Sequence, residues 1–267
     1  MPWASALAQD SYTLLVEPSY PPETAAEVYR PLLDYLRQEA GLALELRTVR
    51  DYLVYWRDLR GNQAADFVFE DAHFTDYRSR RFGFVPLVKA GEPMRFVLLV
   101  PREEEGTGPD DLVGRRVATL PAPSLGFLVL RDMFADPVAR PQVVASLSSW
   151  QDGPSLIFAG EVAATLAPAS LAQELQNLVA VAQSRDFPGT ALSAAPTVPP
   201  EVRERVVQAL TVLHEKAVAG SVGLRGAARA QGHALRAGER RGVPRPRAPA
   251  RALPRVSAAL SAQRPAP

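Results

Sequence analysis

The chain has 267 residues, of which 47% are hydrophobic, and a formal net charge of +1 at pH 7. This composition suffices for one large domain or two smaller lobes, and no apolar run reaches the roughly 18 residues of a membrane-spanning helix. The absence of cysteine excludes disulfides, thiol catalysis and cysteine-ligated metal centres.

Strand and helix patterns alternate along most of the chain. Short apolar or alternating runs predict strands at 12–16, 42–49, 66–69, 84–89, 95–100, 112–120, 142–147, 162–166 and 178–182. Apolar residues recurring every three or four positions predict helices at 23–40, 51–60, 72–80, 124–134, 150–159, 169–175 and 199–217. This order predicts an α/β protein whose helices flank its sheets.

The first ten residues, MPWASALAQD, contain the small-x-small form that signal peptidase cleaves, at Ala6-Leu7-Ala8. We hypothesise that residues 1–10 are the remnant of a signal peptide from a longer precursor, and that the protein is exported to the periplasm. The alternative is an ordinary frayed terminus.

The segment 223–267 differs in composition from the rest of the chain. It has ten arginines, one acidic residue and no aromatic residue, so residues 1–222 carry a net negative charge. Such a segment cannot bury enough apolar surface to fold alone, which predicts disorder. A shifted reading frame that begins near residues 216–225 is the other hypothesis. Without aromatic side chains to stack on bases, binding of nucleic acid is not expected.

Motifs of catalysis and of cofactor binding are missing from the sequence. The three histidines, at positions 73, 214 and 233, have no second histidine or carboxylate at ligand spacing, so no metal site is predicted. The chain has no G-x-S-x-G, no P-loop and no G-x-G-x-x-G. We therefore expect no cofactor and no catalytic residue, and the protein is predicted not to be an enzyme.

Three strand-to-helix turns remain as candidate ligand contacts, because open α/β sheets bind ligands at the carboxyl ends of their strands. The turns contribute Ser19 and Tyr20, then Glu70 and Asp71, and then Ser124 and Gly126. Each also has a structural interpretation: the two serines as helix caps, and the two carboxylates as charges favoured at a helix N-terminus.

Four segments, in chain order, resemble the phosphonate/phosphate-type substrate-binding proteins of ABC importers. They are GNQAADFVFE at 61–70, DDLVGRRVAT at 110–119, PSLGF at 123–127 and FAGEVAA at 158–164. The resemblance extends from about residue 12 to residue 214. It implies a type II periplasmic-binding fold: two lobes, each a mixed sheet flanked by helices, with the ligand in the cleft between them.

Mapped onto this chain, the resemblance implies that residues 11–95 and 188–222 form lobe I and that residues 96–187 form lobe II. It also implies a small-molecule ligand, a membrane permease with its ATPase as partners, a monomer, and no insertion of this chain into the membrane. The leading hypothesis is a periplasmic protein that captures a small polar or oxyanion ligand for an ABC importer.

The family comparison adds Trp150 to the candidate ligand-binding residues, because it stands where phosphonate binders tend to have a histidine. Tyr20 matches an aromatic position of the family, whereas Glu70 stands in place of another. Trp150 has two interpretations, stacking on a flat or cationic ligand or simple packing. Two other functions stay open: a sensory ligand-binding module, or an enzyme with Glu17, Glu70 or Asp71 as its base.

Overall fold

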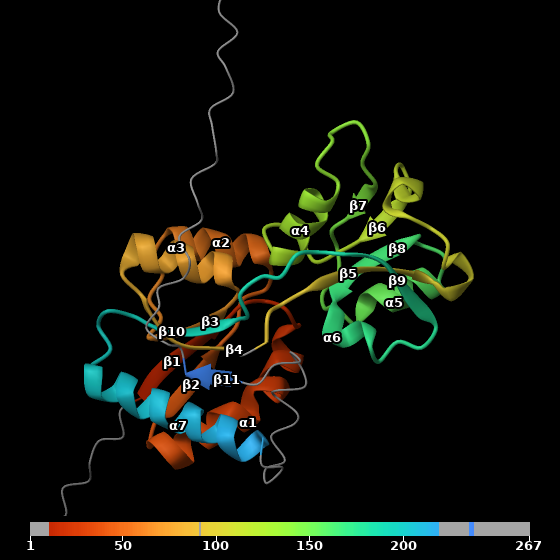
Figure 1. The fold of residues 1–267 in the computed structure, drawn as a ribbon. Coiled ribbons are helices and arrows are strands. Elements are labelled where there is room, and N and C mark those ends of the chain that lie inside the picture. The colour runs from red at the N-terminus through yellow and green to blue at the C-terminus, as the bar shows by residue number, and fades with distance from the viewer. Residues whose placement is uncertain (1–10, 91, 219–234, 238–267) are drawn as a thin grey trace, which may run out of the picture.

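The computed structural model describes residues 11–90, 92–218 and 235–237, which form two mixed sheets flanked by helices (Figure 1). The first sheet has the order β11-β4-β10-β3-β1-β2. Its strands are β1 (Ser11–Val16), β2 (Ala43–Arg47), β3 (Phe67–Glu70), β4 (Val85–Ala90), β10 (Ala191–Ala194) and β11 (Leu235–Ala237). β1 pairs in parallel with β2 and β3, whereas β10 is antiparallel to β3 and β4.

Four helices cover the two faces of this sheet. They are α1 (Pro22–Ala40), α2 (Tyr52–Arg60), α3 (Ala72–Phe82) and α7 (Pro200–Val218). α2 and α3 lie on one face, and α1 and α7 lie together on the other (Figure 1). Local sequence sets their ends: α1 begins after Pro21 and ends at Gly41, whose φ of 63° favours glycine. We call this sheet and its helices lobe I.

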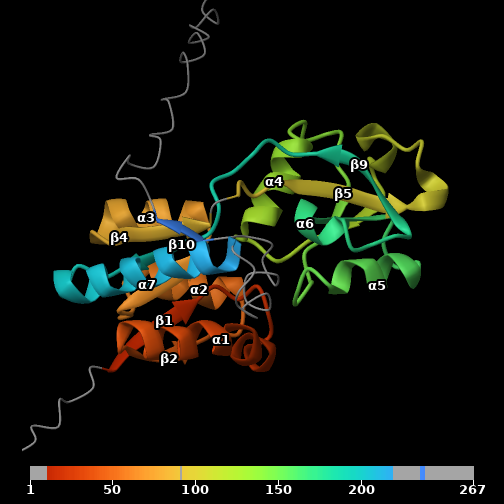
Figure 2. The same cartoon turned by 60° about the horizontal axis from the view of Figure 1, so that its bottom comes forward.

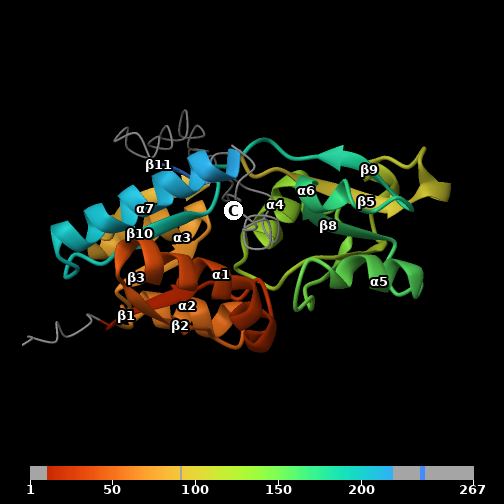
Figure 3. The ribbon, with the colours of Figure 1, turned by 90° about the horizontal axis from the view of Figure 1, so that it is seen from below.

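The second sheet has the order β7-β6-β8-β5-β9 and forms lobe II with its helices. Its strands are β5 (Phe96–Pro101), β6 (Arg116–Ala118), β7 (Gln142–Val144), β8 (Ala164–Pro168) and β9 (Leu178–Gln183). Its helices are α4 (Leu125–Met133), α5 (Asp152–Phe158) and α6 (Ala169–Ala172), and two 3-10 turns, Arg102–Glu104 and Pro109–Leu112, precede β6. Figures 1 and 3 both place α4 on the side of lobe II nearest lobe I.

Two connections join the lobes, one from β4 to β5 and one from β9 to β10, and they run together between the sheets (Figure 2). They pair through Met94 and Phe187, whose backbone N–H groups each donate to the other's carbonyl at 2.8 Å. A hydrophobic cluster in lobe II surrounds Phe96 and Leu98, and a larger one extends from lobe I into lobe II, where it includes Leu99 and Ile157. Paired crossings of this kind are the usual site of hinge bending between two lobes.

The α/β architecture with two mixed, helix-flanked sheets is as the sequence predicts. Some strands differ from expectation, and the strand predicted at 142–147 ends at Val144. The strand predicted at 112–120 is confined to Arg116–Ala118, because a 3-10 turn and Gly114 precede it. β10 is not predicted by the pattern at all, since its four small or apolar residues lie in a Pro- and Gly-rich stretch.

Most residues at the two ends of the chain, among them all of residues 1–10, lie outside the described residues. Within the segment 223–267, Leu235–Ala237 is a strand that pairs antiparallel with β4. The expectation of disorder or of a shifted reading frame in this segment stays a prediction. Within the described ranges, no helix combines the length and the apolar character needed to cross a membrane.

Candidate functional site

The carboxyl ends of β1 and β3 in lobe I lie against the turn after β6 and the turn before α5 in lobe II. His73, at the start of α3, places its Nε2 3.0 Å from the carbonyl oxygen of Pro123 in the turn after β6. Tyr20, in the turn after β1, hydrogen-bonds the side chain of Gln151, the residue before α5. These two contacts join the lobes at the edge where an open α/β sheet binds ligands.

Glu17, directly after β1, is the centre of a buried hydrogen-bond network. Its two carboxyl oxygens accept from the Ser19 hydroxyl at 3.0 Å and from the Asp71 backbone N–H at 3.2 Å. Burial raises the pKa of Glu17 well above its usual value, and the neighbouring charge of Asp71 raises it further. Both effects favour the protonated form of Glu17.

Asp71 follows β3 and is also buried. Burial raises its pKa to about 7, although the Thr190 hydroxyl, 3.2 Å from its carboxylate, favours the charged form. Thr190 precedes β10, and the Ser19 hydroxyl lies 3.1 Å from the Tyr52 hydroxyl at the start of α2. Four turns of lobe I thus meet at one network of carboxyl and hydroxyl groups.

Glu70 belongs to a second, deeper network between the sheet and helices α2 and α3. Its Oε2 accepts from Tyr55 on α2 and from Arg78 Nε on α3, the latter at 3.0 Å. Both members of the ion pair are fully buried. Burial raises the pKa of Glu70, against the opposing effect of Arg78 and Tyr55. Its carboxylate is thus held by lobe I rather than by the turn that faces lobe II.

His73 is neutral in this environment, because burial lowers its pKa to about 4. A neutral ring that bonds a carbonyl through Nε2 must carry its proton there, which leaves Nδ1 as an acceptor. Among the described residues this Nδ1 is buried without a hydrogen-bond partner. The contact between the lobes is therefore a neutral hydrogen bond rather than an ion pair.

Ser124 and Gly126 begin α4 in lobe II. The Ser124 hydroxyl accepts from the Phe127 N–H at 3.2 Å and lies 3.3 Å from the Leu120 carbonyl, so it caps the helix. Gly126 allows the Trp150 ring to lie directly on the backbone of the first turn: an added Cβ would overlap Cη2 and lie 3.1 Å from Cζ3. Trp150 also packs against Phe96, with ring centroids 5.6 Å apart.

The residues proposed from sequence thus fall into three positions. Ser19, Tyr20 and Asp71 lie at the strand ends of lobe I, opposite Ser124, Gly126 and Trp150 of lobe II. Glu70 lies deeper, in its own network. Their role as ligand contacts stays a prediction.

Sequence reasoning missed four members of the site: Tyr52, His73, Gln151 and Thr190. Tyr52 follows the N-cap Asp51, so the second strand-to-helix turn carries a local signal comparable to that of the other three turns. Thr190 precedes a strand that the pattern does not show. His73 and Gln151 were identifiable only by contacts between distant segments.

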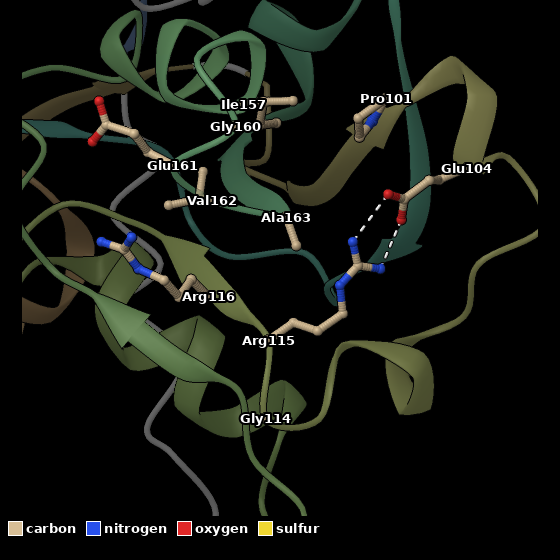
Figure 4. A pocket seen from close by; sticks show the side chains of 10 residues that line it. All are labelled: Pro101, Glu104, Gly114, Arg115, Arg116, Ile157, Gly160, Glu161, Val162 and Ala163. Carbon is tan, nitrogen blue, oxygen red and sulfur yellow. Dashed lines mark hydrogen bonds and ion pairs between the residues drawn. The ribbon is translucent and has the colours of Figure 1, made fainter.

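A separate open pocket of about 440 Å³ lies at the amino ends of β6 and β8 in lobe II (Figure 4). Arg115 and Glu104 form a two-point ion pair across its rim, at 2.7 and 2.9 Å. None of the residues proposed from sequence lines it. Among the described residues, no group of three or more His, Asp or Glu could hold a metal ion.

A family model described as "ABC transporter, phosphonate, periplasmic substrate-binding protein" matches residues 14–235. The chain belongs to this family. The match covers most of the chain and includes both lobes, their two connections and the first residue of β11. No curated protein sequence matches the chain.

Solved structures of similar fold include two phosphonate-related binding proteins. The binding protein component of an ABC phosphonate transporter from Pseudomonas aeruginosa has a TM-score of 0.67 at 14% identity, over 86% of this chain and 82% of that one. PhnD1 from Prochlorococcus marinus, in complex with methylphosphonate, has a TM-score of 0.69 at 10% identity, over 86% and 93%. A Xanthomonas citri protein bound to ATP has a TM-score of 0.62 at 15% identity, over 86% and 92%. At these identities the likeness extends to the fold.

Proposed function

We propose that this chain captures a small polar or oxyanion ligand between its two lobes and delivers it to the permease and ATPase of an ABC importer. The observation that carries the proposal is the meeting of the lobes at their strand ends, through His73 with the Pro123 carbonyl and Tyr20 with Gln151. A ligand that contacts both lobes stabilises the closed arrangement over the open one, because it binds only when the turns face each other.

Binding without catalysis fits the side chains of the site. Ser19 is held by Glu17 and Tyr52, and Ser124 is held by its own helix, so neither serine hydroxyl meets a histidine in the described part of the chain. The raised pKa of Glu17 favours its protonated form, which can donate a hydrogen bond to a ligand. The buried carboxyl groups therefore serve to orient a ligand. Transport places the working protein in the periplasm, in keeping with the export hypothesis.

The test is thermal unfolding in the presence of phosphonates, phosphate, sulfonates and amines, with recovery of each stabilising compound afterwards. A true ligand at 100 times its dissociation constant adds about 2.7 kcal/mol, which raises the melting temperature by roughly 5 °C or more. We expect unchanged compound to be recovered. If no compound stabilises the protein, the proposal fails, and if a stabilising compound is consumed, the enzyme alternative takes its place.

A pair of matched variants tests whether binding occurs between the lobes. Tyr20→Phe removes only the hydroxyl that reaches Gln151, and we expect it to weaken binding of the stabilising ligand. Tyr77→Phe makes the same change on α3, where the ring packs against Trp56 and Phe82 within lobe I, and we expect it to have no effect. Equal affinities for both variants would argue against an interlobe site. Genes for a kinase or cyclase beside this one, instead of a permease and ATPase, would favour the sensory alternative.

A further inference from the structure

We propose that His73 determines which oxyanions bind between the lobes: its Nε2–H group bonds lobe II, and its Nδ1 accepts a hydrogen bond from the P–OH group of a singly protonated phosphonate or phosphate. The inference rests on the proposed function and narrows its ligand class to oxyanions that keep a proton. Sulfonates, which are also tetrahedral but have no proton to donate, are then poor ligands.

The first observation is an acceptor without a partner at the lobe boundary. Six buried side-chain nitrogen or oxygen atoms of the described residues have no hydrogen-bond partner. Five of them belong to side chains within one lobe, namely Glu70, Arg78 and Ser193 in lobe I and Thr119 in lobe II. The sixth is His73 Nδ1, and a single carbon separates it from the nitrogen that bonds Pro123 in the other lobe. Because native proteins rarely leave a buried acceptor without a donor, this atom is suited to receive one from a bound molecule.

The second observation is that the ring is held in one orientation. Its Nε2 lies 3.0 Å from the Pro123 carbonyl oxygen, and the ring packs against the Phe74 ring, with centroids 3.8 Å apart. Phe74 is itself buried and contacts the rings of Tyr52 and Tyr55 on α2. A flip of the imidazole would break the bond between the lobes. Nδ1 therefore stays in place while the lobes are in contact.

The third observation is the charge of the ring. Burial lowers the pKa of His73 to about 4, and only the Pro123 carbonyl opposes this shift, so the ring is neutral near pH 7. Because Nε2 carries the single proton, Nδ1 accepts hydrogen bonds and cannot donate them. A fully ionised oxyanion offers this atom only lone pairs, whereas a P–OH group bonds it. The second proton of a phosphate group has a pKa of about 6, so ligands of the phosphonate class to which this family is assigned have such a group.

Two variants of His73 separate its two contacts, because an asparagine amide reaches the position of Nδ1 and a glutamine amide reaches that of Nε2. His73→Gln keeps a donor for the Pro123 carbonyl and loses the acceptor. His73→Asn keeps an acceptor and loses the bond between the lobes. Ser79→Ala is the control, because it removes a hydroxyl of α3 that donates to the Phe84 carbonyl within lobe I. The probes are methylphosphonate and methanesulfonate, each titrated into these proteins in a calorimeter at about pH 6.

We expect the wild type to bind methylphosphonate at least about tenfold more tightly than methanesulfonate, because a hydrogen bond that involves a charged group is worth that factor. His73→Gln should lose most of this preference. His73→Asn should bind both probes more weakly and keep the preference, and Ser79→Ala should change neither affinity. Equal affinities of the wild type for the two probes, or an unchanged preference in His73→Gln, would overturn the inference.

The comparison of the two probes on the wild type needs no variant, so the inference stays testable even if His73→Gln folds poorly. Failure of the inference and failure of the proposed function have different signatures. If other compounds of the thermal unfolding panel stabilise the wild type but neither probe binds, the inference is wrong and the proposed function stands. If no compound of the panel stabilises the wild type, the proposed function fails and the inference fails with it.

Discussion

The two lobes present the same structural feature, a set of strand-to-helix turns, but they complete it differently. In lobe I the turns bury ionisable groups, with Glu17 and Asp71 in one network and Glu70 with Arg78 in another. In lobe II a capping serine begins α4, and the indole of Trp150, from the segment before α5, packs against the first turn of that helix. The turns of lobe I therefore contain ionisable groups whose charge depends on pH and on their partners. The turns of lobe II contribute uncharged groups that pack and cap.

The largest effect is expected from the buried ion pair of lobe I. Arg78→Met removes the positive charge but keeps much of the apolar stem, which leaves Glu70 buried without its cation. Loss of one partner from a buried pair costs about 3–5 kcal/mol. We expect a loss of that order in the free energy of unfolding, measured by urea denaturation at pH 7.

The double variant Glu70→Leu with Arg78→Met is the control for this experiment. Replacement of both charges by apolar groups removes the unpaired carboxylate, so most of the lost stability should return. Persistence of the full loss would mean that stacking of the Arg78 guanidinium on the Tyr55 and Phe84 rings, rather than its pairing with Glu70, stabilises lobe I.

The second-largest effect is the pH dependence of stability that results from proton binding by Asp71 in lobe I. The pKa of Asp71 is raised from 3.8 to about 7, so between about pH 4 and pH 7 the folded state binds a proton that the unfolded state has released. The free energy of unfolding must then fall as the pH rises through this window, by up to about 1.4 kcal/mol per pH unit. We expect Asp71→Asn to reduce this slope in urea denaturation series, without abolishing it, because the raised pKa of Glu17 remains.

Titration of His73 changes the free energy of unfolding in the opposite direction over part of the same pH range. Its contribution therefore has to be measured separately from that of Asp71. Its pKa is lowered from 6.5 to about 4, so the unfolded state binds more protons and stability rises with pH in this interval. His73→Gln removes this contribution while its amide can still donate to the Pro123 carbonyl. In this background the free energy of unfolding should fall more steeply as the pH rises, because the opposing contribution of His73 is absent. A flat profile there would contradict the raised pKa of Asp71.

Much of the architecture was predictable, because periodicity and turn residues are local signals. The α1 pattern, with Pro21 before it and Gly41 after it, gives the helix within one residue at its start. β10 was not predictable in this way: its residues Ala191–Ala194 become a strand only because β3 and β4 accept them from both sides. Its signal is tertiary rather than local.

The candidate site likewise contains residues that local sequence could indicate and residues that it could not. Sequence could indicate which turns follow strands, and hence Ser19, Asp71 and Ser124, because strand ends and caps are encoded nearby. It could not show that Glu70 binds Arg78 or that Gly126 makes room for Trp150, 24 positions further along the chain. Such pairings depend on how distant segments fold together.

A smaller effect is expected at the capping serine of lobe II. Ser124→Ala removes the acceptor for the Phe127 N–H, and loss of a helix cap costs about 1 kcal/mol. Because both hydrogen bonds of this hydroxyl stay within lobe II, stability should fall by this amount while the affinity for the stabilising ligand is unchanged. Calorimetry and thermal unfolding on the same variant measure both quantities. A large loss of affinity would instead place Ser124 in contact with the ligand.

The smallest effect is expected from the ion pair on the outside of lobe II. Arg115 and Glu104 form two short hydrogen bonds at the pocket rim, but their side chains are 39% and 34% exposed. Water already solvates such charges well, so Glu104→Gln should cost less than about 1 kcal/mol, and the loss should shrink further in salt. Comparison with Arg78→Met in the same urea series isolates burial as the variable, because both experiments remove one partner of an arginine–glutamate pair. A cost for Glu104→Gln that matched the buried pair would mean that closure of the pocket rim, rather than the ion pair alone, holds the start of β6 in place.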